Sequence, residues 1–223
     1  MLTILRLLLA LPILTSCTTP FPTYELTTHR ADTLSERFPD PPNGTRMTLR
    51  AILEYRGMEL PMTFRIWRML PNSCRIIVTD DLGGSLLHVV DHESEFTIIS
   101  RAAALPEEFV RSLCYDLTSW LFARPHPDDQ KVTFADGTPG ILQFQIQNLA
   151  VYAVLQATKA GHPIDRIMNG SGTHLTSEIK LEWDDGRARN VEIENHLSGY
   201  TVDLEVREWQ PAELTPAKFK TKR

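Results

Sequence analysis

An alternation of apolar and polar residues limits what this chain can fold into more than any other feature. Apolar residues occupy every second position from Met47 to Tyr55 and again from Met58 to Ile66, on either side of Gly57. A period of two indicates antiparallel strands that cover a core with one face and meet solvent with the other. The two runs therefore predict a long hairpin at the start of a mainly β domain.

Similar strand signals recur along the rest of the chain. Turn sequences such as Asp80–Gly84 and Asp184–Gly186 separate them. We expect further strands over 74–78, 86–90, 96–100, 142–146, 151–158, 164–168, 179–183, 191–194 and 200–206. The polar stretches around 128–140 and 169–172 are expected to be loops. This organisation predicts one antiparallel sheet.

One helix interrupts the series of strands, and it is expected to begin at Pro106. Proline suits a first helical turn, and Glu107 and Glu108 suit the positive end of the helix dipole. Asp116 lies on the helix among apolar residues, where we expect local capping or pairing and assign no chemistry. A helix this apolar must pack on the sheet, and we expect it across an open side or mouth of a curved sheet. Its apolar stripe comprises Phe109, Val110, Leu113, Cys114, Leu117, Trp120 and Leu121, before Pro125 and Pro127.

Residues 1–17 have the layout of a secretory signal. Arg6 supplies positive charge, residues 7–14 are apolar, and the segment ends Leu14-Thr15-Ser16-Cys17. The apolar run is shorter than the ~20 residues that span a bilayer. The last four residues resemble the lipobox of bacterial lipoproteins, which implies that the Cys17 thiol is diacylated, the signal is cut before it and the new amine is acylated. The alternative is an ordinary signal peptide with an incidental cysteine.

Acylation at Cys17 implies a mature chain held on a membrane that faces an extracytoplasmic space. Each buried CH₂ contributes ~0.8 kcal/mol, so two or three acyl chains anchor a protein effectively for good. The next residue, Thr18, is not aspartate, which by resemblance to the enteric sorting rule implies the periplasmic face of the outer membrane. We therefore expect a protein of the bacterial cell envelope, with membrane lipid as its first partner.

Four segments are predicted: a signal peptide over 1–16, a lipidated flexible tether over 17–45, a half-barrel domain over 46–210 and a basic flexible tail over 211–223. The tether is rich in proline and threonine, which favours an extended spacer. The formal net charge of −5 points to no nucleic-acid partner. Cys74 and Cys114 are predicted to be buried free thiols, since two cysteines make no disulfide framework, although an oxidising compartment would permit a bond.

No catalytic or metal-binding set of residues emerges. Ser171 lies between two glycines, but no helix follows it to make a nucleophile elbow. His88 and His92 would lie ~13 Å apart along a strand, too far to share a metal ion. We therefore expect no enzyme, no catalytic residue, no metal site and no cofactor.

The order of the elements resembles the LolA/LolB superfamily of periplasmic lipoprotein carriers and outer-membrane receptors. The resemblance covers roughly residues 47–209 and rests on the strands with a central helix, on the turn over Thr79–Ser85 and on the closing strand from Gly199 to Trp209. It implies a mainly β fold with a helical insertion, an incomplete antiparallel β-barrel lidded by helices around an apolar cavity. The chain departs from the receptor's pattern in the two aspartates before Leu82 and in the longer spacing of its second half. It could therefore belong to a sister group of the same fold.

The resemblance also implies the roles of particular residues. A leucine in the matching turn of the receptor inserts into the membrane and helps deliver cargo, which assigns that role to Leu82; the alternative is a leucine folded back onto the core. Methionine side chains reshape around varied apolar ligands, which suits an acyl-chain cavity, although ordinary core packing explains them equally. The candidate lining residues are Met47, Met58, Met62, Phe64, Phe96, Phe144 and Tyr200.

The function implied is binding of acyl chains and their transfer or insertion at the outer membrane. The cargo would be a lipoprotein, a glycolipid or another lipid-linked product, received from a periplasmic LolA-like carrier. The alternative is a structural lipoprotein that docks in an envelope assembly and has a filled, ligand-free barrel. The two hypotheses differ over one feature, which is an apolar cavity that accepts ligand.

Overall fold

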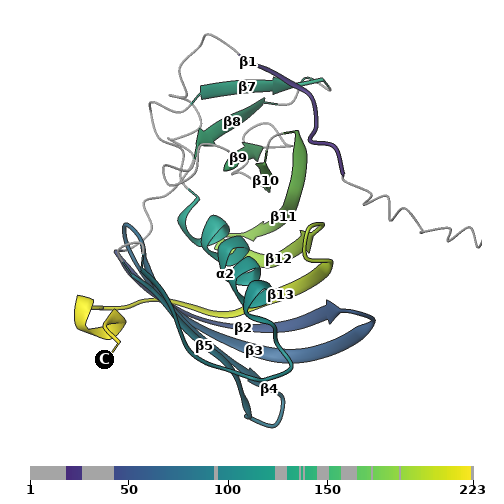
Figure 1. The fold of residues 1–223 in the computed structure, drawn as a ribbon. Coiled ribbons are helices and arrows are strands. Elements are labelled where there is room, and N and C mark those ends of the chain that lie inside the picture. Colours follow the sequence, from purple (N-terminus) through teal and green to yellow (C-terminus); the bar gives the residue numbers. More distant parts are fainter. Residues whose placement is uncertain are drawn as a thin grey trace, which may run out of the picture.

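A computed structural model shows a curved antiparallel sheet with the helix α2 across its concave face (Figure 1). The structure describes residues 19–26, 43–92, 95–123, 130–135, 137, 139–144, 151–156, 165–171, 173–185 and 187–221. The strands are β1 (Tyr24–Leu26), β2 (Gly44–Tyr55), β3 (Met58–Met69), β4 (Ser73–Asp80), β5 (Ser85–His92), β6 (Glu95–Arg101), β7 (Gln130–Phe134), β8 (Pro139–Phe144), β9 (Val151–Gln156), β10 (Arg166–Ser171), β11 (His174–Asp184), β12 (Arg187–Asn195) and β13 (Tyr200–Pro211). The helices are α2 (Glu107–Phe122) and the short 3₁₀ helix η1 (Pro216–Phe219).

The sheet joins the two halves of the chain in one continuous order, β1-β7-β8-β9-β10-β11-β12-β13-β2-β3-β4-β5-β6. The halves meet where β13 pairs with β2, from Tyr200 opposite Tyr55 to Pro211 opposite Thr45. Strands β1 and β6 are its two edges, so the sheet is open. The predicted class, an incomplete antiparallel barrel with a helix across its open side, is confirmed.

The hairpin of β2 and β3 follows the predicted alternation. Leu49 lies opposite Phe64, and both are completely buried under α2. Arg56 and Gly57 have positive φ angles of 53° and 75°, the two-residue turn whose twist suits neighbouring strands. The alternation thus places one face of both strands in the core and leaves the other for solvent.

Helix α2 also has the predicted position and buried stripe. It begins after Pro106, carries Glu107 and Glu108 in its first turn, and buries every residue of the expected apolar face. Its Phe109 ring lies 4.6 Å from that of Tyr55 and 5.1 Å from that of Tyr200, centre to centre. Aromatic packing therefore joins the helix to β2 and β13.

The chain departs from the sequence prediction in two stretches expected to be loops. Residues 130–134 form β7, and β10 continues through Ser171 with a bulge at Asn169 and Gly170. Asn169 is fully buried, so it occupies an interior strand position although its side chain is polar. The polar residues in these two stretches explain why apolar–polar alternation did not predict the strands.

Both terminal segments contain secondary structure that the sequence analysis did not predict. Pro20 forms a β-bridge with His174 and β1 pairs with β7, so residues 19–26 of the predicted tether lie against the sheet. The predicted flexible tail contains η1, whose Phe219 is buried against β4 and β5, with its ring 6.0 Å from that of His92. Short backbone pairings and one apolar side chain explain these differences. Cys17 and the predicted signal peptide lie outside the described residues.

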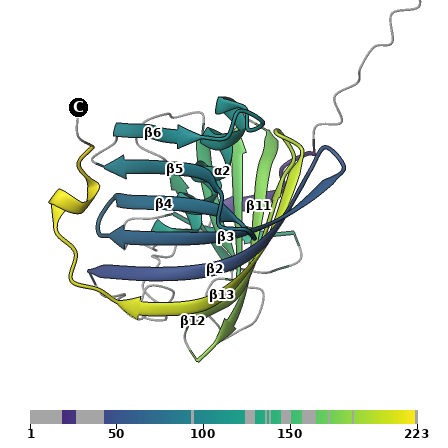
Figure 2. The ribbon, with the colours of Figure 1, turned by 90° about the horizontal axis from the view of Figure 1, so that it is seen from below.

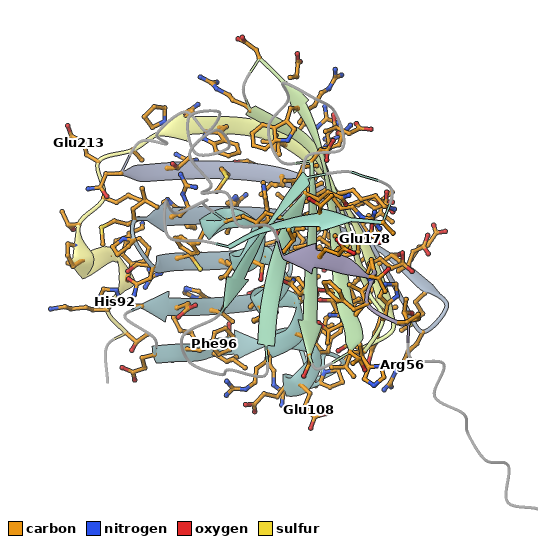
Figure 3. All side chains as sticks on the ribbon, turned by 90° about the horizontal axis from the view of Figure 1, so that it is seen from above. Arg56, His92, Phe96, Glu108, Glu178 and Glu213 are labelled. Atoms are coloured by element: carbon orange, nitrogen blue, oxygen red, sulfur yellow. The ribbon has the colours of Figure 1, made fainter. Side chains whose placement is uncertain are left out.

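Three hairpin turns lie at one end of the sheet, which we call the turn edge: residues 56–57, 81–84 and 196–199. The strand register requires this, because Tyr55 pairs with both Met58 and Tyr200, and Met62 pairs with Asp80. The β3–β4 turn and η1 lie at the opposite end (Figure 2). In Figure 3, Arg56 of the turn edge lies across the molecule from His92 and Glu213.

Candidate functional site

The apolar interface between α2 and the concave face of the sheet is the candidate ligand site. It brings together four of the seven predicted lining residues, all at most 3% exposed: Met47, Met62, Phe64 and Tyr200. Phe96 is partly buried at its margin, with the Arg111 guanidinium 5.1 Å from the ring centre. Met58 stands apart at the turn edge with 52% of its surface exposed. The side chain of Phe144, on β8, lies outside the described residues.

One buried carboxylate fastens α2 to the sheet. Asp116 accepts hydrogen bonds from Tyr200 Oη at 2.5 Å, Ser177 Oγ at 2.5 Å, Asn195 Nδ2 at 2.8 Å and Asn169 Nδ2 at 3.4 Å. These partners belong to β13, β11, β12 and β10. The expectation of local pairing was therefore wrong, and we call these five residues the Asp116 cluster.

Burial and hydrogen bonding act in opposite directions on the carboxyl group. Loss of water raises the pKa of Asp116, and the four donated hydrogen bonds partly offset this, leaving the pKa above its usual value. Burial and the neighbouring carboxylate also raise the pKa of Tyr200, so the phenol stays protonated and donates. The cluster is therefore a set of satisfied polar contacts inside an apolar interface.

A buried arginine holds the C-terminal end of α2. Arg68 Nη1 donates to the carbonyl of Leu121 at 2.8 Å, and Nη2 donates to Thr45 Oγ1 at 3.1 Å. A cation at a helix C-terminus is stabilising because the last carbonyl groups carry partial negative charge. The Asp116 cluster thus fixes the middle of α2 to the sheet, and Arg68 fixes its C-terminal end.

The two cysteines of the folded body face this same interface. Cys74 on β4 and Cys114 on α2 are free, buried thiols. Burial raises the pKa of Cys74 to about 12, and burial likewise raises the pKa of Cys114. Both remain protonated at neutral pH, where they behave as small apolar side chains.

Hydrogen bonds close the turn that carries Leu82, and this leucine points into solvent. The Asp80 carboxylate accepts the backbone N–H of Leu82 at 3.0 Å and that of Gly84 at 2.6 Å. Gly83 has a φ of 84°, which only glycine adopts readily. Leu82 is 97% exposed, so it does not fold back onto the core.

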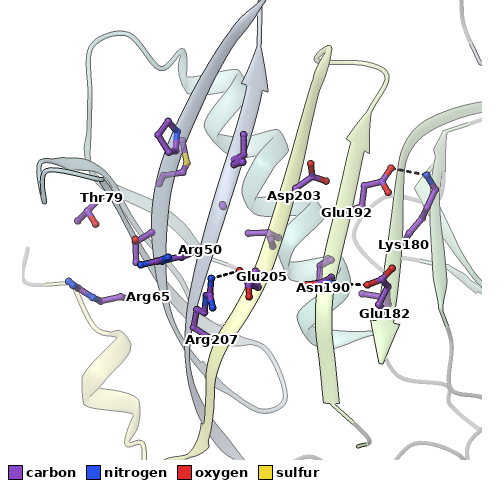
Figure 4. Close-up of a pocket in the computed structure, with 18 of the residues that line it drawn as sticks. Arg50, Arg65, Thr79, Lys180, Glu182, Asn190, Glu192, Asp203, Glu205 and Arg207 are labelled. Atoms are coloured by element: carbon purple, nitrogen blue, oxygen red, sulfur yellow. Dashed lines mark hydrogen bonds and ion pairs between the residues drawn. The ribbon is translucent and has the colours of Figure 1, made fainter. Parts of the chain in front are cut away.

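A large hollow lies on the other face of the sheet, away from α2 (Figure 4). It measures about 1500 Å³ and crosses β2, β3 and β11–β13. Ion pairs line it: Lys180 Nζ lies 2.8 Å from Glu192, and Arg207 lies 2.6 Å from Glu205. Charged walls do not suit an acyl chain, so the apolar site lies on the concave face.

The described part of the chain offers neither a metal cluster nor a spanning helix. Its His, Cys, Asp and Glu residues form no group of three that could hold a metal ion. None of its helices is long and apolar enough to cross a membrane.

Sequence reasoning missed the polar anchors of α2, although a signal was present. Ser177 continues the interior positions of Ile179 and Leu181, and Asn195 continues those of Val191 and Ile193. Arg68 likewise follows Ile66 on the inward face of β3. A polar residue at an interior strand position indicates a buried partner.

Comparisons with known proteins support the fold. The chain matches no family model and no curated protein sequence. Among solved structures, a LolA superfamily protein from Nitrosomonas europaea has a TM-score of 0.56 and 10% identity, over 86% of this chain and 98% of that one. A domain from Vibrio parahaemolyticus described as an outer membrane lipoprotein-sorting protein has a TM-score of 0.51 and 12% identity, over 85% and 94%. The predicted LolA-like fold is confirmed.

Proposed function

We propose that this protein is a lipid-anchored envelope lipoprotein that binds the acyl chains of lipoproteins or other lipid-linked cargo. It would hold them between α2 and the sheet and help their transfer or insertion at the outer membrane. The observation that carries the proposal is the attachment of α2: an apolar interface closed by a helix with separate polar anchors at its middle and at its C-terminal end. We infer binding and transfer without enzymatic chemistry.

The proposed mechanism is a difference in affinity between two apolar environments. Movement of α2 would open the interface between Met62 and Phe64 on the sheet and Leu117 on the helix. Acyl chains would displace apolar contacts of similar energy, so a ligand can favour the open state. The membrane, reached through Leu82 and the acylated Cys17, would then offer the chains a more stable site.

One observation favours the alternative, a docking lipoprotein with a filled core. Met47, Met62, Phe64 and Tyr200 are all buried with α2 in place. A protein that never moves this helix has no room for an acyl chain on its concave face.

Native mass spectrometry of residues 18–223, produced in the periplasm without the anchor, distinguishes the two. Copurified or added diacyl lipopeptide should appear as bound mass that organic extraction removes. A ligand-free mass that persists with added lipopeptide and fatty acid would refute acyl binding and favour docking.

A further inference from the structure

A second leucine is exposed at the turn edge. Leu197, in the turn between β12 and β13, has 78% of its surface in solvent. The turn is well formed: Gly199 N–H donates to the Asn195 carbonyl at 2.9 Å, and Ser198 N–H donates to Asn195 Oδ1 at 2.6 Å. A single exposed leucine is common on protein surfaces, so its meaning depends on what lies beside it.

The N-terminal segment runs along the start of β11, the strand that also contacts this turn (Figure 1). The carbonyl of Thr19 accepts the N–H of Leu175 at 3.0 Å. The carbonyl of the following residue, Thr176, accepts the N–H groups of His196 and Leu197 at 2.9 and 3.4 Å. Thr19 and Leu197 are therefore attached to adjacent residues of β11, on its two opposite edges, and both lie at the same end of this strand.

This pairing limits how far a lipid on Cys17 can be from the folded body. Cys17 precedes Thr19 by two residues, so their Cα atoms are at most ~7 Å apart. A lipid at Cys17 would thus leave the body at the turn edge and not at the end of a long spacer. The bilayer surface must then lie close to Leu197.

The chemistry of the turn suits a lipid surface. Residues 195–199 contain no carboxylate, whereas Leu82 follows Asp80 and Asp81, so Leu197 enters a head-group layer with less desolvation. The adjoining hollow of about 510 Å³ is lined by Met58 and the cation Arg56, together with the carboxylates Glu54, Glu59 and Glu194.

We propose that the turn between β12 and β13 is a bilayer contact, in which Leu197 inserts among the lipids that hold Cys17. This inference rests on the acylation of Cys17 in the proposed function. It sets the turn edge toward the membrane, together with the first turns of α2. Ser198 Oγ lies 2.9 Å from Ser112 Oγ of α2, so the contact adjoins the helix that closes the ligand site. Acyl chains would then pass directly between that site and the bilayer.

Site-specific fluorescence tests this orientation in the full acylated chain. The cysteine of Leu197→Cys is labelled with an environment-sensitive dye, and the protein is bound to vesicles of phosphatidylethanolamine and phosphatidylglycerol. Asn72→Cys, in the β3–β4 turn at the opposite end, is the matched control. The buried Cys74 and Cys114 are not expected to react. Insertion into the bilayer should blue-shift the emission at position 197, and lipids with a quencher in the acyl chain should reduce it, while both signals at position 72 stay unchanged.

The outcomes separate this inference from the function on which it rests. Intact mass reports acylation of Cys17, and flotation with vesicles reports anchoring. An acylated protein that floats, but whose label at 197 is quenched no more than that at 72, overturns the bilayer contact alone. A protein that is not acylated overturns both proposals.

Discussion

Replacing Asp116 with alanine tests whether one buried carboxylate holds α2 on the sheet. The change removes the common acceptor of four donors. Two of these donors keep another acceptor: Asn195 Nδ2 still donates to Ser112 Oγ at 3.1 Å, and Asn169 Nδ2 still donates to Ser177 Oγ at 2.9 Å. The hydroxyl groups of Tyr200 and Ser177 lose the acceptor to which they donate.

Each unsatisfied buried donor costs about 1–3 kcal/mol, so Asp116→Ala should lower the free energy of unfolding by roughly 4 kcal/mol. That is a large part of the ~5–15 kcal/mol that stabilises a typical domain. Urea denaturation of residues 18–223, followed by circular dichroism, measures the loss. Tyr200→Phe is the matched control, because it removes one donor and should cost about 1 kcal/mol. A loss below about 1 kcal/mol for Asp116→Ala would refute the anchoring role.

The remaining predictions concern pH, the second anchor, the exposed leucine and the thiols. The raised pKa of Asp116 means that its protonation stabilises the folded state: this pH-dependent part of the stability is full below the usual aspartate pKa and is lost as pH rises through the raised value. The free energies of unfolding of wild type and Asp116→Asn should therefore differ by an amount that changes over that pH range, and a constant difference would contradict it. Arg68→Met removes two hydrogen bonds donated by a charged group, so it should lower the free energy of unfolding by about 2–3 kcal/mol. It should also speed hydrogen exchange at the C-terminal end of α2, and unchanged exchange there would show that Arg68 does not anchor the helix. Leu82→Glu should block transfer of labelled lipopeptide to vesicles while changing the free energy of unfolding by less than about 0.5 kcal/mol. Leu82→Met is the control and should transfer normally. Equal transfer by both variants would show that Leu82 has no role in delivery. Cys74 and Cys114 should react with a thiol reagent only after unfolding, and rapid reaction of the folded protein would show that the interface opens freely.

The parts of the fold that depend on residue period could be predicted from sequence. Alternation from Met47 to Ile66 gave the central hairpin, and the stripe from Phe109 to Leu121 gave the helix and its buried face. Both signals arise because one side of each element is apolar throughout. Strand β7 and the end of β10 lack that uniformity.

The contacts that hold the candidate site together could not be predicted in the same way. Asp116 meets partners 53 to 84 residues away in sequence, which only the folded sheet brings together. The pairing of Pro20 with His174 involves a proline-rich segment without strand periodicity. The exposure of Leu82 and Leu197 likewise depends on where their turns point, a property that a turn sequence does not encode.

Photo-cross-linking with a diacyl lipopeptide tests acyl binding most directly. A diazirine near the end of an acyl chain labels whatever side chain lies beside it, and peptide mass spectrometry locates the label. We predict labels on the concave face, at Met62, Phe64 and Leu117, and none in the charged hollow around Arg50 and Glu205. Labels confined to that hollow, or no labels under conditions that label a fatty-acid-binding control protein, would contradict acyl binding between α2 and the sheet.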